Sequence, residues 1–476
     1  MRRRTLVAFA ALACHTALAQ VPAAPAHPPE EPPFQGDAYR LMREIGSRST
    51  AFRNLEELCD DVGGRPNGSE ALRNAQTWIR AKLAASGIRT VVEEPFTIPS
   101  TWTRGVETAR LVTANGVKLR IAQVAWTPAT AGAIRGPVVP VGGATIEELR
   151  ASLASARGKI ALRGDLPKAP GGRDPVLFKR EVRALFDEAG VAALLFPMSR
   201  AGNTLQTVGT PIRNAGQWTP AVPTAYVGQE HANLLRRLLA RGQRVELELE
   251  LGGQVHPEET RLTNLIAEVP GARRPDEFVI LGAHLDSVDL ATGASDNGAG
   301  VVVLLDVLTA VKALGLRPDR TLRVIFFSGE ELEGIGSRAY VRAHAGDLAG
   351  VQAVLVLDKG GGRILGWPTM GQEAWVPLLA EAIAPAYTVG GSQIIPGQIR
   401  GSDHDPFFEA GVPAFFAYQE ALDYWDVYHS DLDSLDHVKP ENLVQAGQAL
   451  AAAAWGFLQM DRRLPHLPAG KASAHP

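Results

Sequence analysis

The sequence predicts an α/β protein: a doubly wound mixed sheet with a smaller β-rich domain inserted into it. From Thr263 onward, short apolar runs typical of strands alternate with longer amphipathic stretches typical of helices. Residues 100–255 instead contain short strand-like runs separated by Gly and Pro. At 476 residues the chain is also too long for one ordinary domain. These observations together predict two domains.

The predicted elements of the doubly wound part are helices and strands in a regular order. Residues 70–88 repeat apolar positions on one helical face, and Gly87 is expected to end that helix. Residues 90–98 are expected to form a strand. After Thr263 the expected strands are 264–269, 278–283, 321–327, 351–357 and 412–418, and the expected helices are 298–314, 337–345 and 441–460.

The N-terminus has the pattern of a signal peptide. Three arginines at positions 2–4 precede the apolar run 6–13, and Ala17-Leu18-Ala19 is a cleavage motif. No later segment has an uninterrupted apolar run long enough to span a bilayer. We therefore expect a secreted or periplasmic protein with no membrane association after cleavage.

Composition shifts give the expected boundaries. The predicted parts are a signal peptide (1–19), a proline-rich linker (20–36), a main domain (37–99 and 256–463), the inserted domain (100–255) and a C-terminal tail (464–476).

Charge and cysteine content narrow the class of protein. The net charge is −3, and no long basic run occurs, so nucleic acid is not an expected partner. Cys14 lies in the predicted signal peptide, which leaves Cys59 alone. The mature chain is therefore expected to have no internal disulfide.

Acids and histidines follow the predicted strands at the points where those strands end. In an open α/β sheet the carboxyl ends of the strands form one edge, where ligands bind. We therefore expect these side chains to converge although they are far apart in sequence. They are His284 and Asp286 after 278–283, Glu330 and Glu331 after 321–327, Asp358 after 351–357, Asp296 before the helix at 298, and His429 beyond the last strand.

Such a cluster of carboxylates requires cations. Divalent metals would relieve the repulsion, and His with Asp or Glu but no thiolate suits zinc, manganese or cobalt. Three carboxylates and two histidines are enough for two metals if one carboxylate bridges them. Glu331 would bind a metal, and Glu330 would be free to act as a general base on a metal-bound water.

Each residue also has an ordinary structural interpretation. His284 could be a buried structural histidine, Asp296 could cap the following helix, and Glu330 and Glu331 could be solvated. The joint pattern favours the metal interpretation, because every member stands at the end of an apolar run. The sequence contains no H-E-x-x-H, no G-x-G-x-x-G after a strand and no Walker motif, so those sites are not expected.

Four motifs resemble the co-catalytic zinc aminopeptidase family. They are HLDSVDLATGASDNGAG, SGEELEGIGS, VLDKGG and YHSDLDS, between residues 284 and 434. LGLRPDRTLRVIFFSGEE is particularly similar to the plasma glutamate carboxypeptidase (carboxypeptidase Q) branch. GKIALRGD and TPAVPTAYVG resemble a protease-associated domain, which such proteins carry as an insertion.

The resemblance implies a role for each matching position. It implies two zinc ions per chain, with Asp296 bridging them, Glu331 and His429 completing one site, and His284 and Asp358 completing the other. It further implies that Glu330 is the general base, that Asp286 holds the far nitrogen of His284, and that Tyr428 donates a hydrogen bond to the oxyanion. Asn297 departs from the family, which often has a second Asp there.

The implied function is an exported zinc exopeptidase that hydrolyses dipeptides or short peptides with a free N-terminus. Glu330 and Asp358 are the expected acceptors for the terminal ammonium, and Asp403 is expected to be either a third acceptor or a helix cap before His404. The alternatives are a carboxypeptidase of the same family, for which Lys359, Arg363 or Arg400 would bind the terminal carboxylate, and a catalytically inactive receptor-like binding protein. A peptide is the expected partner, and the resemblance is compatible with a homodimer.

Overall fold

The main sheet is mixed, as the sequence predicts. The structure, a computed structural model, describes residues 35–112, 116–207 and 221–468, so the predicted signal peptide lies outside the described residues. Parallel strands β13, β12, β14 and β17 form most of this sheet, and β1 and β11 add an antiparallel edge. Within the described residues the order is β1 (Val91–Ile98), β11 (Thr260–Val269), β13 (Arg320–Phe327), β12 (Arg274–His284), β14 (Val351–Val356) and β17 (Ala414–Phe416).

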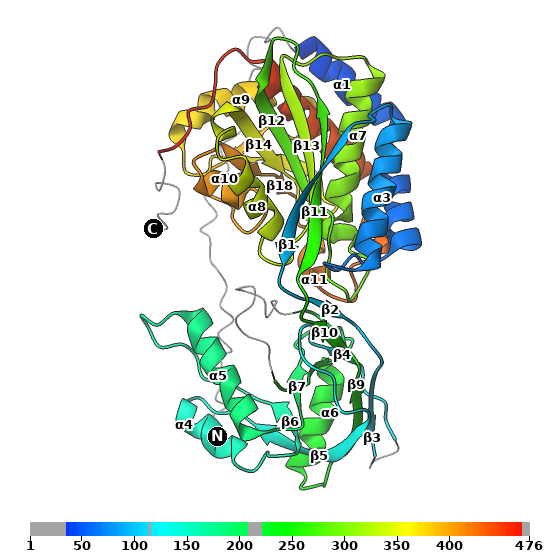
Figure 1. Cartoon of the computed structure of the whole chain (residues 1–476), viewed down its shortest axis with the longest axis vertical. Helices are drawn as coiled ribbons and strands as arrows, with labels where there is room; N and C mark the ends of the chain where they lie inside the picture. Colours follow the sequence, from blue (N-terminus) through cyan, green and yellow to red (C-terminus); the bar gives the residue numbers. More distant parts are fainter. Residues whose placement is uncertain (1–34, 113–115, 208–220, 469–476) are drawn as a thin grey trace, which may run out of the picture.

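Helices cover both faces of the main sheet. Figure 1 shows α7 (Ala299–Ala313) and α8 (Ile335–Ala343) on opposite sides. This arrangement is expected because right-handed connections lead from β12 to β13 and from β13 to β14 in opposite directions along the sheet. On the face of α7 lie α1 (Gln35–Arg48) and α12 (Pro440–Gln459), and α10 (Asp405–Glu409) packs beside α8.

Helix α7 is a core helix. The stretch from Ala294 to Ala313 is apolar and long enough to cross a membrane, and the sequence analysis did not expect such a segment. However, 94% of its apolar window is buried inside the protein. It packs against α1, α2 (Ala51–Glu57), α12 and the sheet. Its all-round apolar surface is therefore explained by burial between layers.

Local signals fix the ends of α3 (Glu70–Ala85). Its N-cap residue is Ser69, whose hydroxyl oxygen accepts a 3.1 Å hydrogen bond from the backbone N–H of Leu72. After the helix, Gly87 has a φ of +81°, a conformation that glycine adopts without strain. The helix thus ends where the sequence predicts.

The chain leaves the main unit after β1 and returns just before β11. The outgoing strand β2 (Thr101–Thr103) pairs antiparallel with the incoming strand β10 (Gln254–His256). This two-stranded junction separates the main unit (residues 35–98 and 260–468) from an inserted unit (residues 101–256), which lies at the opposite end of the molecule in Figure 1.

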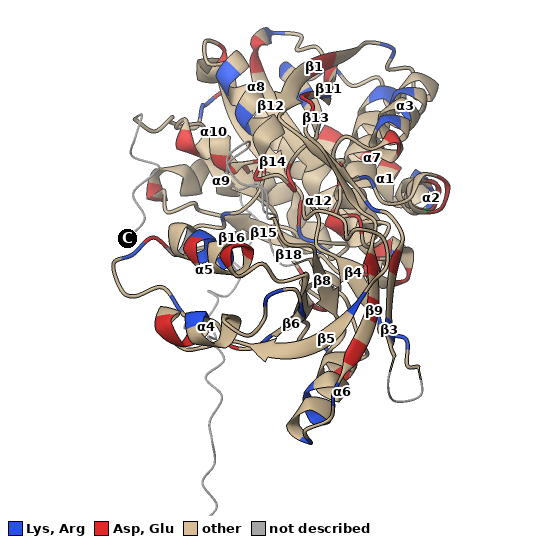
Figure 2. Cartoon of the chain, turned by 60° about the horizontal axis from the view of Figure 1, so that its bottom comes forward, with Lys and Arg blue, Asp and Glu red and all other residues tan. Residues whose placement is uncertain are grey.

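The inserted unit is α/β rather than simply β-rich. Strands β5, β6, β7 and β8 run parallel, and parallel neighbours need crossover segments. Helix α4 lies in the crossover from β5 to β6, and α5 lies in the crossover from β6 to β7. Basic and acidic residues are interspersed along α4 and α5 in Figure 2. In the described residues the strand order is β3 (Glu107–Leu111), β9 (Glu246–Leu251), β5 (Ile134–Val141), β6 (Ile160–Arg163), β7 (Ala193–Pro197), β8 (Thr224–Val227) and β4 (Ile121–Gln123), with helices α4 (Ile146–Leu153), α5 (Pro175–Ala189) and α6 (Gln229–Ala240).

At both ends of the described main unit, residues that were predicted to lie in the linker or the tail belong to the packed structure. Helix α1 already begins at Gln35, within the predicted linker. At the other end, Leu464 is buried, the indole N–H of Trp375 donates to the carbonyl of Pro465, and His466 contacts the carbonyl of Val351 at 2.7 Å. Residues 464–467 therefore pack on the main unit instead of starting a free tail.

The remaining elements are short. They are the helices α9 (Val376–Ile383) and α11 (Tyr424–Val427), and a small sheet of β16 (Gln393–Ile395), β15 (Ile364–Pro368) and β18 (Tyr418–Gln419).

Candidate metal centre

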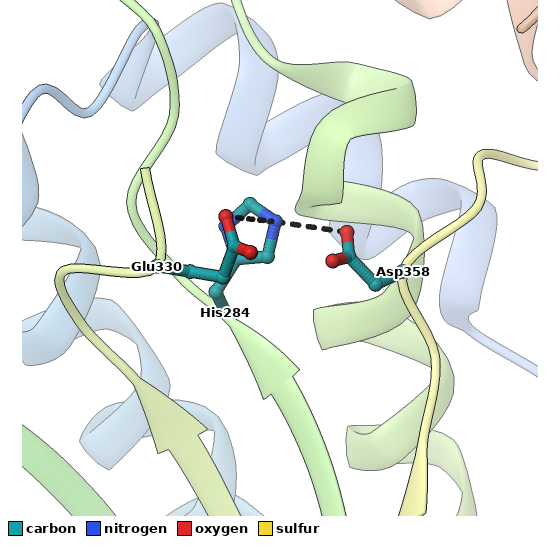
Figure 3. A group of neighbouring side chains, drawn as sticks. All are labelled: His284, Glu330 and Asp358. Carbon is teal, nitrogen blue, oxygen red and sulfur yellow. Dashed lines mark hydrogen bonds and ion pairs between the residues drawn. The ribbon is translucent and has the colours of Figure 1, made fainter. Parts of the chain in front are cut away.

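The parallel strands bring the predicted side chains to one edge of the main sheet. His284 is the last residue of β12 and is aligned with Phe327, the last residue of β13. Glu330 and Glu331 follow β13, and Asp358 follows β14. Figure 3 shows His284, at the end of β12, and Glu330 and Asp358, in the loops after β13 and β14, pointing toward one another.

The first group of donors surrounds the imidazole of His284. Its Nε2 lies 2.9 Å from Asp358 Oδ1, 3.1 Å from Asp296 Oδ1 and 3.9 Å from Glu330 Oε2. Donor atoms of His284, Glu330 and Asp358 all lie within 4.8 Å of one another. This spacing can hold a metal ion.

The second group surrounds His429. Its Nε2 lies 3.0 Å from Glu331 Oε2 and 3.3 Å from Asp296 Oδ2. These three residues likewise place one donor atom each within 4.8 Å of the others. Asp296 presents Oδ1 to His284 and Oδ2 to His429, so one carboxylate faces both groups.

The electrostatics of the cluster suit added cations. Burial and the neighbouring charge of Asp358 hold the pKa of Glu330 well above its usual range, and burial raises the pKa of Asp358 to about 6. Burial opposes protonation of His429, yet Glu331 and Asp296 raise its pKa to about 11. Among the described residues, Glu331 Oε1 is buried and accepts no hydrogen bond. Nitrogen and carboxylate donors in this arrangement fit zinc.

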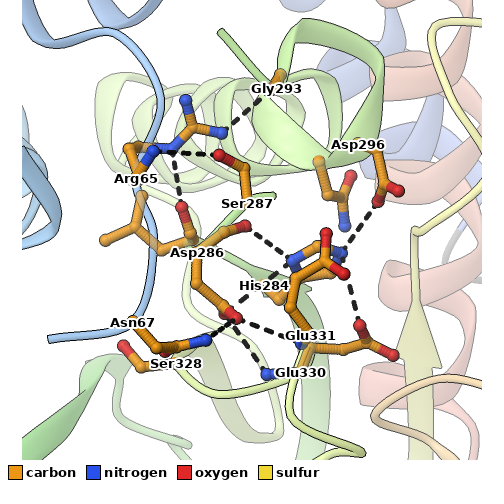
Figure 4. Close-up of polar contacts among 12 residues, drawn as sticks. Arg65, Asn67, His284, Asp286, Ser287, Gly293, Asp296, Ser328, Glu330 and Glu331 are labelled. Atoms are coloured by element: carbon orange, nitrogen blue, oxygen red, sulfur yellow. Dashed lines mark hydrogen bonds and ion pairs between the residues drawn. The ribbon is translucent and has the colours of Figure 1, made fainter. Parts of the chain in front are cut away.

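Asp286 organises the centre through backbone groups. Its carboxylate accepts hydrogen bonds from the side-chain amide of Asn67 at 2.6 Å and from the backbone N–H of Glu331 at 3.1 Å and of Glu330 at 3.3 Å (Figure 4). The nearest contact of His284 Nδ1 is with the backbone carbonyl of Asp286 at 2.8 Å, whereas the carboxylate is 3.8 Å away. Asp286 therefore contacts the far nitrogen of His284 through its backbone carbonyl, while its carboxylate holds the segment of Glu330 and Glu331.

A fully buried arginine, which the sequence analysis did not single out, holds the loop between β12 and α7. Arg65 donates to the carbonyls of Leu285 at 2.6 Å, Thr292 at 2.6 Å and Gly293 at 2.9 Å. Its backbone N–H also donates to the hydroxyl of Ser287 (Figure 4). This loop carries Asp286 and leads to Asp296, so Arg65 shapes the centre without contacting a donor atom.

Asp433 holds Asp296 in place. It is completely buried, and its two carboxylate oxygens accept hydrogen bonds from the backbone N–H groups of Ser295 at 2.7 Å and Asp296 at 3.0 Å. Asn297 donates to the carbonyl of Leu357 and accepts from the N–H of Gly300. The Asn at this position thus links the start of α7 to the residue directly before Asp358. The sequence signal for Asp433 was its place in YHSDLDS.

The inserted unit contacts the loop that carries His429. The backbone N–H of Thr207 donates to the carbonyl of His429 at 2.7 Å, and the side-chain amide of Gln206 donates to the carbonyl of Tyr428 at 3.0 Å. The ring of Tyr428 stacks on that of His429 with centroids 3.7 Å apart. Burial and the adjacent carboxylates hold the pKa of Tyr428 far above its usual range, so its hydroxyl keeps its proton.

Two cavities meet at the centre. One has a volume of about 150 Å³ and is lined by Lys359, Phe416 and Trp425 together with Asp296 and Asp358. The other has a volume of about 470 Å³ and is lined by residues of both units, including Gln206, Thr207 and Arg338. Glu330, Tyr428 and His429 line both cavities.

The residues predicted to bind the ends of a peptide substrate, three cations for the carboxylate and Asp403 for the ammonium, lie in different surroundings. Arg400 is paired with Asp405 at 2.6 Å and Glu409 at 2.8 Å. Arg363 is exposed and donates to the carbonyl of Val389. Asp403 is completely buried, and burial raises its pKa to about 8. Lys359 lines the smaller cavity.

The fold and these donor groups are those of an α/β metallopeptidase. Residues 264–454, which lie in the main unit, match the model of peptidase family M28.

Similar proteins cover nearly the whole chain. Mouse (Mus musculus) carboxypeptidase Q is 28% identical over 419 residues, which are 88% of this chain and 87% of the mouse protein. The crystal structure of a peptidase M28 precursor from Shewanella amazonensis superposes with a TM-score of 0.76 at 28% identity, covering 91% of this chain and 99% of that one. BSAP, a zinc aminopeptidase from Bacillus subtilis, has a TM-score of 0.64 at 22% identity, covering 87% and 96%, which shows a shared fold.

Proposed function

We propose that this protein is an exported dinuclear zinc exopeptidase that removes residues from dipeptides or short peptides with a free N-terminus. The observation that carries the proposal is the position of Asp296 between the two donor groups, 3.1 Å from His284 and 3.3 Å from His429. In this proposal two zinc ions would share Asp296. His284 and Asp358 would complete the site of one ion, and Glu331 and His429 would complete the site of the other.

Bound zinc would supply Lewis-acid polarisation of a carbonyl and would lower the pKa of water. Glu330 accepts the proton of the attacking water and passes it to the leaving amine. Its carboxylate is suited to this task because it lines both cavities and has a raised pKa. Tyr428 donates a hydrogen bond to the oxyanion from its protonated hydroxyl.

The negative charge of the centre supports binding of the N-terminal ammonium group of a peptide substrate. A terminal ammonium needs acceptors, and Glu330 and Asp358 both line the smaller cavity. The relatives named above include both a carboxypeptidase and an aminopeptidase, so similarity alone does not decide which end of a peptide the protein cleaves. For a carboxypeptidase, Lys359 would be the cation available in that cavity.

The test combines metal analysis with modified substrates. The purified protein should contain close to two zinc ions per chain and hydrolyse a dipeptide panel. Chelation should abolish hydrolysis, and zinc should restore it. N-acetylation of a good tripeptide should stop cleavage, whereas C-terminal amidation should matter less. Full activity in the presence of chelator would refute the role of zinc. Cleavage of the N-acetylated tripeptide together with loss of cleavage on C-terminal amidation would refute the aminopeptidase role.

A further inference from the structure

The smaller cavity contains a half-buried ammonium group that forms no ion pair with a carboxylate among the described residues. Lys359 directly follows the donor Asp358 and lines the cavity with it. Its Nζ lies 5.2 Å from the ring centroid of Tyr418 and 6.0 Å from that of Trp425. Aromatic faces attract a cation, but they leave its charge uncancelled.

Arg400, the other cation in the same cavity wall, provides the contrast. Its guanidinium is already neutralised by Asp405 and Glu409. An unpaired ammonium that is partly removed from water costs free energy unless an anion or polar group joins it. Lys359 is therefore the cation in this wall that is available to a ligand.

The remaining lining suits an organic ligand. Phe416 and Tyr424 are both buried, whereas Trp425 is 56% exposed. These apolar rings would contact the stem of a side chain, while Lys359 supplies one positive charge. Glu330 and His429 also line this cavity, and the scissile bond would lie beside them under the proposed function.

We infer that Lys359 binds a carboxylate of the substrate in this cavity and makes the protein selective for substrates that carry a carboxylate at that position. The inference rests on the proposed function, and it adds the substrate class. Two carboxylates could occupy the position: the side chain of an N-terminal Asp or Glu, and the C-terminal carboxylate of a dipeptide. Both present the same chemistry to Lys359.

Kinetics with the zinc-loaded full chain separate these sources. The side-chain arm compares glutamyl-4-nitroanilide with alanyl-4-nitroanilide, and the terminal arm compares alanylalanine with its C-terminal amide. Lys359→Met should lower the ratio of kcat/KM for the carboxylate-bearing substrate over its neutral partner by roughly 10- to 100-fold in one arm, mainly through KM. Lys359→Arg should restore part of the ratio. Arg363→Met removes an exposed arginine outside the cavity and is the matched control.

A binding measurement keeps the test independent of turnover. Calorimetric titration of the zinc-loaded protein with glutarate should give a Kd that is about tenfold weaker for Lys359→Met than for the unmodified chain. Equal losses for charged and neutral substrates, with unchanged glutarate binding, would show that Lys359 only supports Tyr418 and Trp425 and would overturn the inference. If no peptide is cleaved but glutarate binding depends on Lys359, the proposed function fails while the carboxylate site stands.

Discussion

The backbone N–H of Thr207, in the inserted unit, donates a 2.7 Å hydrogen bond to the carbonyl oxygen of His429, in the main unit. His429 has a φ of +53°, which lies in the left-handed region that residues other than glycine rarely adopt. Such a conformation persists only where surrounding contacts hold it. The inserted unit supplies those contacts, so it supports a donor residue as well as lining the larger cavity.

Loss of this support should weaken metal binding. Asp431 Oδ1 accepts a 3.0 Å hydrogen bond from the N–H of Leu205, and the carboxylate also pairs with Arg120, so Asp431→Ala removes contacts between the units. We expect about a tenfold loss in affinity for the zinc ion that His429 would hold, as is typical when residues that support a ligand are removed. Zinc retention in a chelator competition is the measurement. Glu248→Ala breaks a surface pair with Arg110 elsewhere in the inserted unit and is the matched control. Identical zinc retention in the two variants would contradict the supporting role.

The adjacent acids Glu330 and Glu331 should have separable effects. Glu330→Gln keeps the shape but removes the proton acceptor, so we expect zinc to stay bound and kcat to fall by roughly 10²- to 10⁴-fold. Glu331 lies 3.0 Å from His429 Nε2, and Glu331→Ala should lower zinc content as well as activity. Zinc analysis and kcat are measured on the same samples. Near-normal turnover by Glu330→Gln would show that another group accepts the proton.

The donor side chains could be predicted because their positions follow from local patterns. His284, Glu330 and Asp358 each come after an apolar run, and parallel strands place such residues at one edge. Asp296 was predictable from the glycine-rich entry to α7. The register of the sheet and the distances between the donors required the structure, because they depend on how strands far apart in sequence pair.

The supporting residues could not be predicted because their partners are backbone groups of distant segments. Arg65 donates to carbonyls near residues 285 and 293, and no sequence pattern marks a carbonyl as an acceptor. The same limitation applies to the contact of Thr207 with His429. Side chains that contact backbone carry little local signal even when they determine the geometry of a site.

Arg65 should be essential for the stability of the main unit. Its guanidinium also donates to the carbonyl of Gly63, so Arg65→Met would leave four acceptors without this donor. Because each unsatisfied buried group costs about 1–3 kcal/mol, we expect a loss of at least about 3 kcal/mol in the free energy of unfolding. Urea denaturation measures it, and Arg236→Met, an exposed change on α6, is the control. Equal stability of the two variants would show that water or other donors replace Arg65.

His404 should make the protein less stable in mild acid. It is completely buried, its Nε2 lies 2.7 Å from the carbonyl of Ile399, and burial lowers its pKa although Asp405 lies 3.2 Å away. A carbonyl can only accept, so Nε2 carries the proton, and among the described residues Nδ1 has no hydrogen-bond partner. The folded protein therefore holds this imidazole neutral.

The sign of the pH effect follows from the lowered pKa. As pH falls below about 6.5, the ordinary pKa of histidine, the unfolded chain binds a proton at this position before the folded chain does. The stability that neutral His404 confers is thus present above about pH 6.5 and is lost as pH falls toward its lower folded pKa. His404→Gln retains an amide donor for the carbonyl of Ile399 but does not titrate. Urea unfolding of the metal-free protein at pH 7.5 and pH 5.5 should show a smaller acid-induced loss for this variant than for the unmodified chain. His256→Gln, at the junction of the units, should leave that loss unchanged, and an equal loss in all three proteins would assign the acid sensitivity to other groups.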